Sequence, residues 1–360
     1  MCIRQRVVNQ CILCPTRFIC LGILVPIAFL IMAGCGTREG FHLAYTDGQT
    51  IFGRTADTIA ELATAAAQTL IQPGSVEGFS MTLYKSRRWI AWLEDDDEIR
   101  IDGVAGILGG SLLVESVEGS TRPGLATDGS TLYLSTSRGA HAFLYRSTDD
   151  GQSWTWRRMD LPFVAGCTDL TFQDGVLWLA ITSLGHEPTD QVLVVATPIS
   201  GINSDSAGHV FAVTNLPPGI DGSKGVRIVV NGDKIAVSCV SRQLQLVVVG
   251  IDDRRTGYVA SGEIIESTGL SWHAGTRNDG SHGDRYCPAA PIFDGGDLCW
   301  IVSSARSQTQ LQHLHAHCLA GFIPFEEMPA MTVYDIAIVQ GPALNVLELP
   351  ANVLEIPPNR

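Results

Sequence analysis

Charged and imidazole side chains recur beside the ends of short apolar runs, where loops should meet strands. A guanidinium group holds a carboxylate through two parallel hydrogen bonds, so arginines gathered around one opening favour an anionic ligand. Loops are also polar simply because they contact solvent, and that explanation stays open. The side chains that we expect on one shared face are Arg122, Arg138, His141, Asp169, His186, Arg242, His282, Asp284, Arg285 and Arg306.

Metal chemistry has little support in the sequence. His313, His315 and His317 alternate with apolar residues and would share one face of a strand, but a metal would need a further ligand nearby. Packing or solvent exposure explains this pattern more simply. We find no zinc-type cysteine spacing after residue 35, no phosphate-binding glycine loop, no Gly-x-Ser-x-Gly and no His-Glu-x-x-His. The sequence therefore predicts neither a metal nor a cofactor.

The overall charge argues against one class of partner. The formal net charge is −13, with 37 acidic and 24 basic side chains. A surface that acidic repels phosphate backbones, so we do not expect nucleic acid as a partner.

The elements that must position these side chains form a repeat after Gly78. Each copy has an apolar strand, a turn with Gly or Asp, a second apolar strand, a polar loop and a third strand. Turn glycines at 129, 175, 232 and 295 are 46 to 63 residues apart, roughly the length of a four-stranded propeller blade. Second strands such as VLWLAIT are apolar on both faces, as expected where sheets stack against neighbours on either side.

We therefore predict an all-β fold, a β-propeller of about six blades (five to seven), with a β-sandwich pair as the alternative. In a propeller, loops entering first strands and loops between second and third strands lie on the same face. That geometry is the reason for expecting the charged side chains above to share a face.

One segment also suggests a family. Ser147, Asp149, Gly151 and Trp154 follow a predicted third strand with the spacing Ser-x-Asp-x-Gly-x-x-Trp. Asp149 can accept backbone N–H groups across the turn, Gly151 can adopt a left-handed conformation and Trp154 can fold back over the hairpin. The segment resembles the Asp box of sialidases and of other proteins with bacterial-neuraminidase-type repeats. The resemblance implies a structural role for Asp149, on the face opposite an active site.

The resemblance to sialidases extends over one blade. Arg122 would match the first of three arginines that clamp a carboxylate, Arg285 could be another, and Tyr334 is similar to the tyrosine nucleophile of the last blade. The sequence departs from the family in three respects: Ile is missing after Arg122, and neither a third arginine nor an acid/base carboxylate is identifiable.

The N-terminus predicts export. A basic lead-in is followed by an apolar run of about 15 residues, shorter than the roughly 20 of a spanning helix. Met32-Ala33-Gly34-Cys35 resembles a lipobox, which implies cleavage after residue 34 and lipid on Cys35. Gly36 at the next position suggests the outer membrane of a Gram-negative bacterium. An uncleaved membrane anchor is the alternative.

Three domain assignments follow: a signal peptide over 1–34, a lipidated lead-in with a short helix over 35–78, and the propeller over 79–360. Thr58 and Glu61 have capping-box spacing for the helix, and Pro73 should end it. The apolar face of this helix should contain Ile59, Leu62, Ala66 and Leu70. Five cysteines remain after Cys35, and we favour Cys299 and Cys318, on successive predicted strands, as a disulfide in an oxidising compartment.

Two functions fit these observations best, and an assembly scaffold that uses the sides or edges of the blades stays open as a third. The first is a binding module: a lipid-anchored propeller at the cell envelope that presents one loop-rich face to a glycan or a protein. The second is an exo-glycosidase of sialidase type acting on terminal anionic sugars, with Arg122 and Arg285 holding a carboxylate and Tyr334 attacking the sugar. A complete arginine clamp with an acid/base carboxylate would distinguish them.

Overall fold

The computed structural model describes the chain between Glu39 and Pro342, with gaps. The described ranges are 39–95, 97–104, 111–184, 191–198, 209–215, 225–232, 234–240, 246–252, 263–267, 289–294, 297–305, 312–318, 321–324 and 335–342. All of them belong to one compact unit, Arg38–Arg360. The signal segment and Cys35 lie outside the described residues.

The described residues form six four-stranded antiparallel sheets, which we number as blades. Blade 1 contains β24 (Asp335–Pro342), β1 (Glu39–Thr46), β2 (Ile51–Ala56) and β3 (Gln68–Ile71). Blade 2 contains β4 (Gly78–Tyr84), β5 (Arg87–Glu94), β6 (Glu98–Gly103) and β7 (Leu112–Ser116). Blade 3 contains β8 (Gly124–Thr127), β9 (Leu132–Arg138), β10 (His141–Ser147) and β11 (Thr155–Asp160).

The other three blades follow in chain order. Blade 4 contains β12 (Ala165–Gln173), β13 (Val176–Ser183), β14 (Gln191–Pro198) and β15 (His209–Asn215). Blade 5 contains β16 (Val226–Asn231), β17 (Lys234–Val240), β18 (Leu246–Asp252) and β19 (Glu263–Ser267). Blade 6 contains β20 (Ala289–Asp294), β21 (Asp297–Ala305), β22 (Gln312–Cys318) and β23 (Gly321–Pro324).

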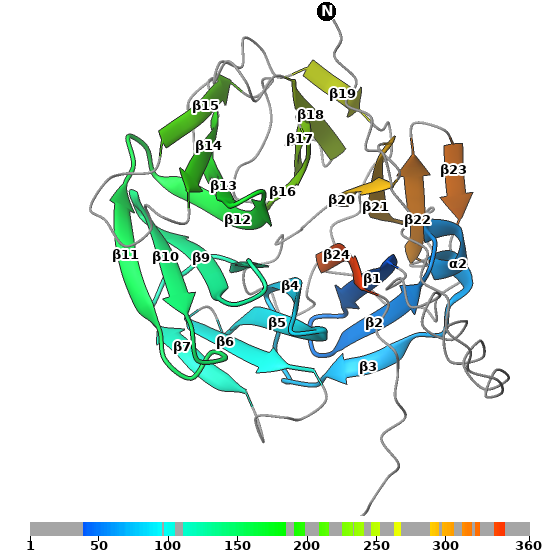
Figure 1. Cartoon of the computed structure of the whole chain (residues 1–360), viewed down its shortest axis with the longest axis horizontal. Helices are drawn as coiled ribbons and strands as arrows, with labels where there is room; N and C mark the ends of the chain where they lie inside the picture. The colour runs from blue at the N-terminus through cyan, green and yellow to red at the C-terminus, as the bar shows by residue number, and fades with distance from the viewer. Residues whose placement is uncertain are drawn as a thin grey trace, which may run out of the picture. The chain divides into compact units, whose positions relative to one another are not determined.

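The six innermost strands close a ring (Figure 1). They are β4, β8, β12, β16, β20 and β24, and each contacts the next, with β24 returning to β4. The last strand closes the ring because β24 pairs with β1, so that Thr46 lies opposite Asp335. The predicted β-propeller is confirmed.

The N-terminal part of the ring differs from the sequence-based expectation. The strands β1, β2 and β3 complete the blade that β24 begins, so Glu39–Ile71 belongs to the ring and not to a lead-in before residue 79. The predicted helix is present as α2 (Ile59–Thr64), and the Thr58 hydroxyl accepts from the backbone N–H of Glu61.

This helix is shorter than we expected. Leu70 lies on β3, which pairs with the edge of β2. That pairing satisfies the backbone hydrogen bonds of β3, so this segment forms a strand although its apolar residues have helical spacing. The guanidinium of Arg54 donates to the carbonyl of Ala63 at 2.8 Å and so bonds one of the last carbonyl groups of the helix.

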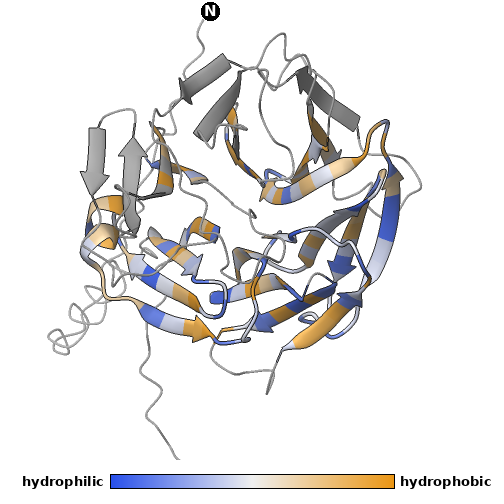
Figure 2. Ribbon diagram, turned by 180° about the vertical axis from the view of Figure 1, so that it is seen from behind, coloured by the Kyte–Doolittle hydropathy of each residue, from blue (hydrophilic) through white to orange (hydrophobic). Residues whose placement is uncertain are grey.

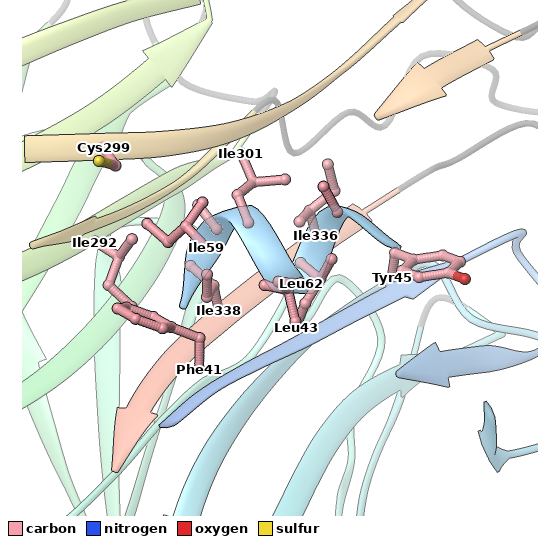
Figure 3. Close-up of a cluster of buried hydrophobic side chains, with 12 residues drawn as sticks. Phe41, Leu43, Tyr45, Ile59, Leu62, Ile292, Cys299, Ile301, Ile336 and Ile338 are labelled. Carbon is pink, nitrogen blue, oxygen red and sulfur yellow. The ribbon is translucent and has the colours of Figure 1, made fainter. Parts of the chain in front are cut away.

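The core consists of apolar layers between neighbouring blades. Apolar residues recur along many strands (Figure 2), and blade 4, for example, packs apolar side chains against both of its neighbours. One such layer joins blades 6 and 1, where Ile59 and Leu62 of α2 pack with Leu43, Ile301 and Ile338 (Figure 3). Burial on both faces of a sheet explains why second strands read as continuous apolar runs.

Candidate functional site

The inner strands enclose a cavity on the ring axis. Its volume is about 410 Å³, and described residues of all six inner strands line it. Ser80, Thr82, Thr127 and Thr171 are among the residues that line it, together with Val229. A concave space with a few polar groups is the usual form of a small-molecule site.

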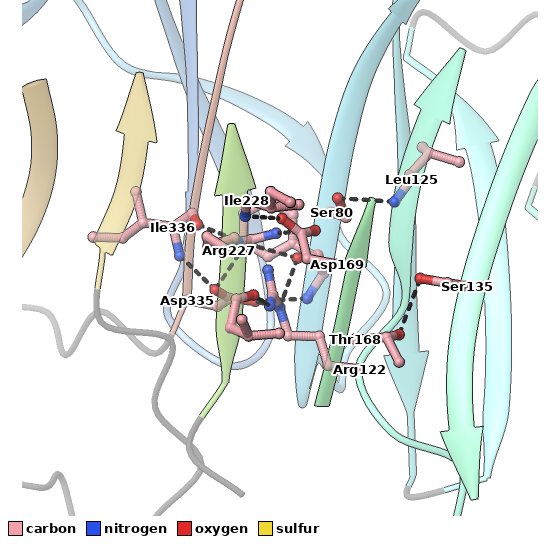
Figure 4. A network of polar contacts seen from close by, with 12 residues as sticks. Ser80, Arg122, Leu125, Ser135, Thr168, Asp169, Arg227, Ile228, Asp335 and Ile336 are labelled. Carbon is pink, nitrogen blue, oxygen red and sulfur yellow. Dashed lines mark hydrogen bonds and ion pairs between the residues drawn. The ribbon is translucent and has the colours of Figure 1, made fainter. Parts of the chain in front are cut away.

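Four buried charged residues gather beside this cavity (Figure 4). Asp335, the first residue of β24, receives Arg122 Nε at 2.7 Å and Arg227 Nη2 at 3.0 Å. It also accepts the backbone N–H groups of Phe79 and Ile336, both at 2.8 Å. Asp335 is 2 % exposed, so its charge is held almost entirely by these neighbours.

The two arginines also bind backbone carbonyls and thereby connect strands. The Phe79 carbonyl accepts from Arg122 Nε at 3.1 Å and from Arg227 Nη2 at 2.9 Å. Arg122 Nη1 donates to the carbonyl of Val226 at 3.0 Å, and Arg227 Nη2 to that of Ile336 at 2.6 Å. The network therefore ties β4, the segment before β8, β16 and β24 together around the axis.

Asp169, on β12, has a perturbed acidity. Its Oδ2 accepts the backbone N–H of Ile228 at 2.9 Å, and its Oδ1 lies 3.5 Å from Arg227 Nη1. Burial raises the pKa of Asp169 to about 7, although the charge of Arg122 and two backbone N–H groups oppose that shift. Asp169 and Arg227 both line the cavity, and Asp169 Oδ1 and Arg227 Nε have no hydrogen-bond partner among the described residues.

Close strand packing builds this end of the cavity. A Cβ atom on Gly124 would lie 2.7 Å from the backbone nitrogen of Leu170 and 2.8 Å from the Cα of Asp169. Only glycine allows β8 to approach β12 this closely. The position of Asp169 against the axis therefore depends on Gly124.

The structure brings together Arg122 and Asp169 from the predicted face, at buried positions on the axis. Arg122 does meet a carboxylate, but it is that of Asp335 in the same chain. The other two members of the sialidase-type catalytic set, Arg285 and Tyr334, lie outside the described residues. So do His186, Arg242, His282, Asp284 and Arg306.

Sequence reasoning missed Arg227 and Asp335. A signal for both was available, because each is a charged residue at the start of an otherwise apolar first strand, in VRIVV and DIAIV. A charge in such a run is buried once the strand becomes innermost, and a buried charge needs a partner of opposite sign.

Arg138 and His141 lie elsewhere, on the second and third strands of blade 3. Arg138 Nη1 pairs with Glu115 Oε1 at 2.8 Å, and His141 Nδ1 lies 2.9 Å from Asp160 Oδ1. Both side chains are partly exposed. Of the described members of the predicted face, two therefore lie at the axis and two lie beside the turn between the second and third strands of blade 3.

The segment from Ser147 to Trp154 forms the turn between β10 and β11. The Ser147 hydroxyl donates to Asp149 Oδ1 at 2.8 Å, and the backbone N–H of Ser153 donates to the same oxygen at 2.9 Å. Gly151 has φ of 79°, and Trp154 Nε1 donates to its carbonyl at 3.0 Å. Hydrogen bonds, first of all from the Ser153 hydroxyl, lower the pKa of Asp149 to about 2.

Cys299 forms a disulfide, and Cys318 lies directly opposite it in the register of β21 and β22. The pairing of these two residues stays a prediction.

Across the described ranges, no cluster of three or more His, Cys, Asp or Glu side chains could hold a metal ion. The described part of the chain also contains no helix with the length and apolarity needed to cross a bilayer.

Comparisons with known proteins show the fold. No family model and no curated protein matches the sequence. Among solved structures, TolB from Acinetobacter baumannii is similar with a TM-score of 0.51 at 12 % identity, over 87 % of this chain and 69 % of that one. A triple mutant of AofleA from Arthrobotrys oligospora is similar with a TM-score of 0.52 at 10 % identity, over 84 % of this chain and 89 % of that one.

Proposed function

We propose that this chain is a lipid-anchored β-propeller of the cell envelope that binds a glycan, with sugar hydroxyls entering the axial cavity. The observation that carries the proposal is the pair formed by Asp169 and Arg227, two buried polar side chains on the wall of a 410 Å³ space. The resemblance of Ser147–Trp154 to an Asp box supports a carbohydrate ligand over a protein one. Lipid attachment at Cys35, and with it an outer-membrane location, belongs to this proposal.

The chemistry of the cavity favours a hydroxyl-rich ligand. Arg227 Nε–H can only donate a hydrogen bond, whereas an ionised Asp169 can only accept one. A hydroxyl group does both, so one sugar hydroxyl can bridge the two. The hydroxyl groups of Ser80 and Thr171 along the wall can then pair with neighbouring hydroxyls of the same ring.

The position of the charged residues agrees with ligand entry at the loop-rich face. Asp335 is the first residue of β24, and Arg227 is the second of β16. Arg122 lies two residues before the start of β8. The network therefore lies where the loops from preceding blades enter the inner strands, which is the face that we expect to present the ligand site.

Ligand titration of the full chain tests the binding proposal. The probes are methyl glycosides of neutral and anionic monosaccharides, followed by calorimetry. Val229→Phe places an aromatic ring in the cavity and should abolish binding of any glycoside that the unchanged chain binds. Val164→Phe is the matched control, because Val164 is 49 % exposed and is absent from the cavity wall. Absence of binding to every probe, or equal affinity in the Val229→Phe variant, would contradict the proposal.

The glycosidase remains a second candidate for one reason. A carboxyl group with a pKa near 7 keeps its proton close to neutral pH, as a general acid must, and Asp169 has that property. Hydrolysis of a fluorogenic sialoside or another glycoside by the full chain, lost in Asp169→Asn, would establish it. A chain that binds glycosides without turning any of them over is a binding module.

Lipid anchoring is tested by cell fractionation. Cys35→Ala should move the protein from the membrane fraction to the soluble fraction, since the lipid would have no attachment site. Cys20→Ala, inside the segment that cleavage would remove, is the matched control and should leave the protein anchored. Membrane association of Cys35→Ala with an unprocessed N-terminus would show an uncleaved anchor instead.

A further inference from the structure

A second surface with the chemistry of a sugar site lies on the outer part of blade 3, against blade 2. We call it the rim patch and define it as Glu115, Arg138, Phe143 and Trp156. Trp156 belongs to the outermost strand of its blade, β11, and is 62 % exposed, the highest value among the exposed large apolar side chains of the described residues. An exposed indole presents a large apolar ring face with a polar N–H group at its edge.

The remaining members fix the geometry around this ring. Phe143 is buried, with its centroid 6.0 Å from that of Trp156 and 4.6 Å from the guanidinium carbon of Arg138. Arg138 and Trp156 therefore both lie beside the same phenyl ring. Glu115 reaches across from blade 2 and pairs with Arg138 at 2.8 Å.

Glu115 holds Arg138 in a defined direction. The hydroxyl of Tyr145 donates to Glu115 Oε2 while Arg138 bonds Oε1, so the carboxylate is fixed between two partners. The Glu115 side chain is 8 % exposed, whereas that of Arg138 is 30 % exposed. Glu115 thus fixes the direction of the guanidinium group, which stays accessible to solvent. This is the arrangement of a preorganised hydrogen-bond donor.

The charges of this region balance locally. Arg138 pairs with Glu115, and Arg158 Nε lies 3.0 Å from Asp160 Oδ1. Because these arginines are already paired with carboxylates, the patch does not attract an anion, and an uncharged ligand fits it better. A protein partner is also disfavoured, because a standard interface covers about 800 Å² on each side and needs a buried apolar centre. In the rim patch Trp156 is the exposed apolar side chain, since Phe143 is only 6 % exposed.

We propose that the rim patch is a separate binding site for a neutral pyranose. The apolar C–H face of the sugar stacks on Trp156 and its hydroxyl groups accept hydrogen bonds from Arg138, with Glu115 as a positioning residue. The ligand class rests on the proposed function, but the location is independent of the axial cavity. Two sites would let one tethered chain hold a branched or repeating glycan at two points, with the gain in avidity that such linkage brings.

Titration of the full chain with neutral methyl glycosides of glucose, galactose, mannose, fucose and N-acetylglucosamine tests this proposal. Tryptophan fluorescence and calorimetry give the affinity and the number of sites. Trp156→Ala should weaken binding roughly tenfold or more, the size of losing one aromatic contact with its buried area. Trp156→Phe should keep part of the affinity. Leu113→Ala is the matched control, because Leu113 is 50 % exposed and outside the patch.

The outcomes separate this proposal from the preceding one. Loss of binding in Trp156→Ala and in Arg138→Gln, with Val229→Phe unchanged, supports the rim patch and removes the axial site. Loss in Val229→Phe alone overturns the rim patch and leaves the axial site in place. Two sites, one sensitive to each change, support both. If no neutral glycoside binds, or if only a protein ligand does, the rim patch proposal is wrong.

Discussion

Asp149 and Asp169 lie on neighbouring blades, and their environments shift their acidities in opposite directions. Asp149 is an exposed residue of the turn between β10 and β11, with a pKa lowered to about 2. Asp169 lies on the innermost strand of the next blade, is 4 % exposed and has a pKa raised to about 7. The same side chain therefore has a lowered pKa in one region and a raised pKa in the other.

The difference shows which physical effect dominates in each region. At Asp149 the hydroxyl and backbone N–H of Ser153 stabilise the carboxylate, and water remains in contact with it, so the hydrogen bonds decide the shift. At Asp169 there is also a hydrogen bond from Ile228, and Arg227 is 3.5 Å away, yet removal from water outweighs both. At Asp169, burial therefore outweighs the nearby positive charges and sets the direction of the pKa shift.

The substitution with the largest expected effect removes Asp335, the carboxylate at the centre of the buried network. Asp335→Ala would leave Arg122 and Arg227 buried without their shared carboxylate, which costs roughly 3–5 kcal/mol in the free energy of unfolding. Asp149→Ala should cost less, since water can bond the groups that it releases. Urea unfolding followed by tryptophan fluorescence measures both, with Asp294→Ala, exposed at the end of β20, as the control. A greater loss in Asp149→Ala than in Asp335→Ala would reverse our ranking of the two regions.

The next test uses the raised pKa of Asp169. Its folded value of about 7 exceeds the unfolded value of 3.8, so the native state binds more protons between these two pH values. The contribution of Asp169 to stability is therefore complete below about pH 4 and is lost as the pH rises toward 7, at up to roughly 1.4 kcal/mol per pH unit. Urea midpoints of the unchanged chain should fall relative to those of Asp169→Asn over this range. A constant difference between the two proteins from pH 5 to 8 would show that Asp169 is ionised throughout.

The same pair shows what could be predicted from the sequence. The partners of Asp149 are two and four residues away, so the spacing of the segment was sufficient to predict its turn. The alternation of apolar residues and the turn residues are equally local signals, and they predicted the propeller. Even so, the end of α2 was missed, because the pairing of β3 with β2 is a tertiary interaction.

The axial site is a product of long-range closure. Arg122 and Asp335 are 213 residues apart, and they meet only because β24 returns to the first blade in the register that places Asp335 opposite Thr46. Arg122 and Asp169 were predicted as members of one face, and they are neighbours, but their burial was not foreseen. Composition and periodicity identify a strand, whereas the position of that strand in the ring decides which of its side chains lose contact with water.

The smallest expected effect concerns Asp149 in acid. Its folded pKa of about 2 lies below the unfolded value of 3.8, so its contribution to stability is present above about pH 4 and is lost as the pH falls toward 2. The difference in urea midpoint between the unchanged chain and Asp149→Asn should therefore be smaller at pH 3 than at pH 7. Ser153→Ala removes the hydroxyl that lowers this pKa most, and it should move the loss to a higher pH. An equal difference at both pH values would mean that Asp149 acts through the shape of the turn alone, and the contrast with Asp169 would then be one of burial and not of charge.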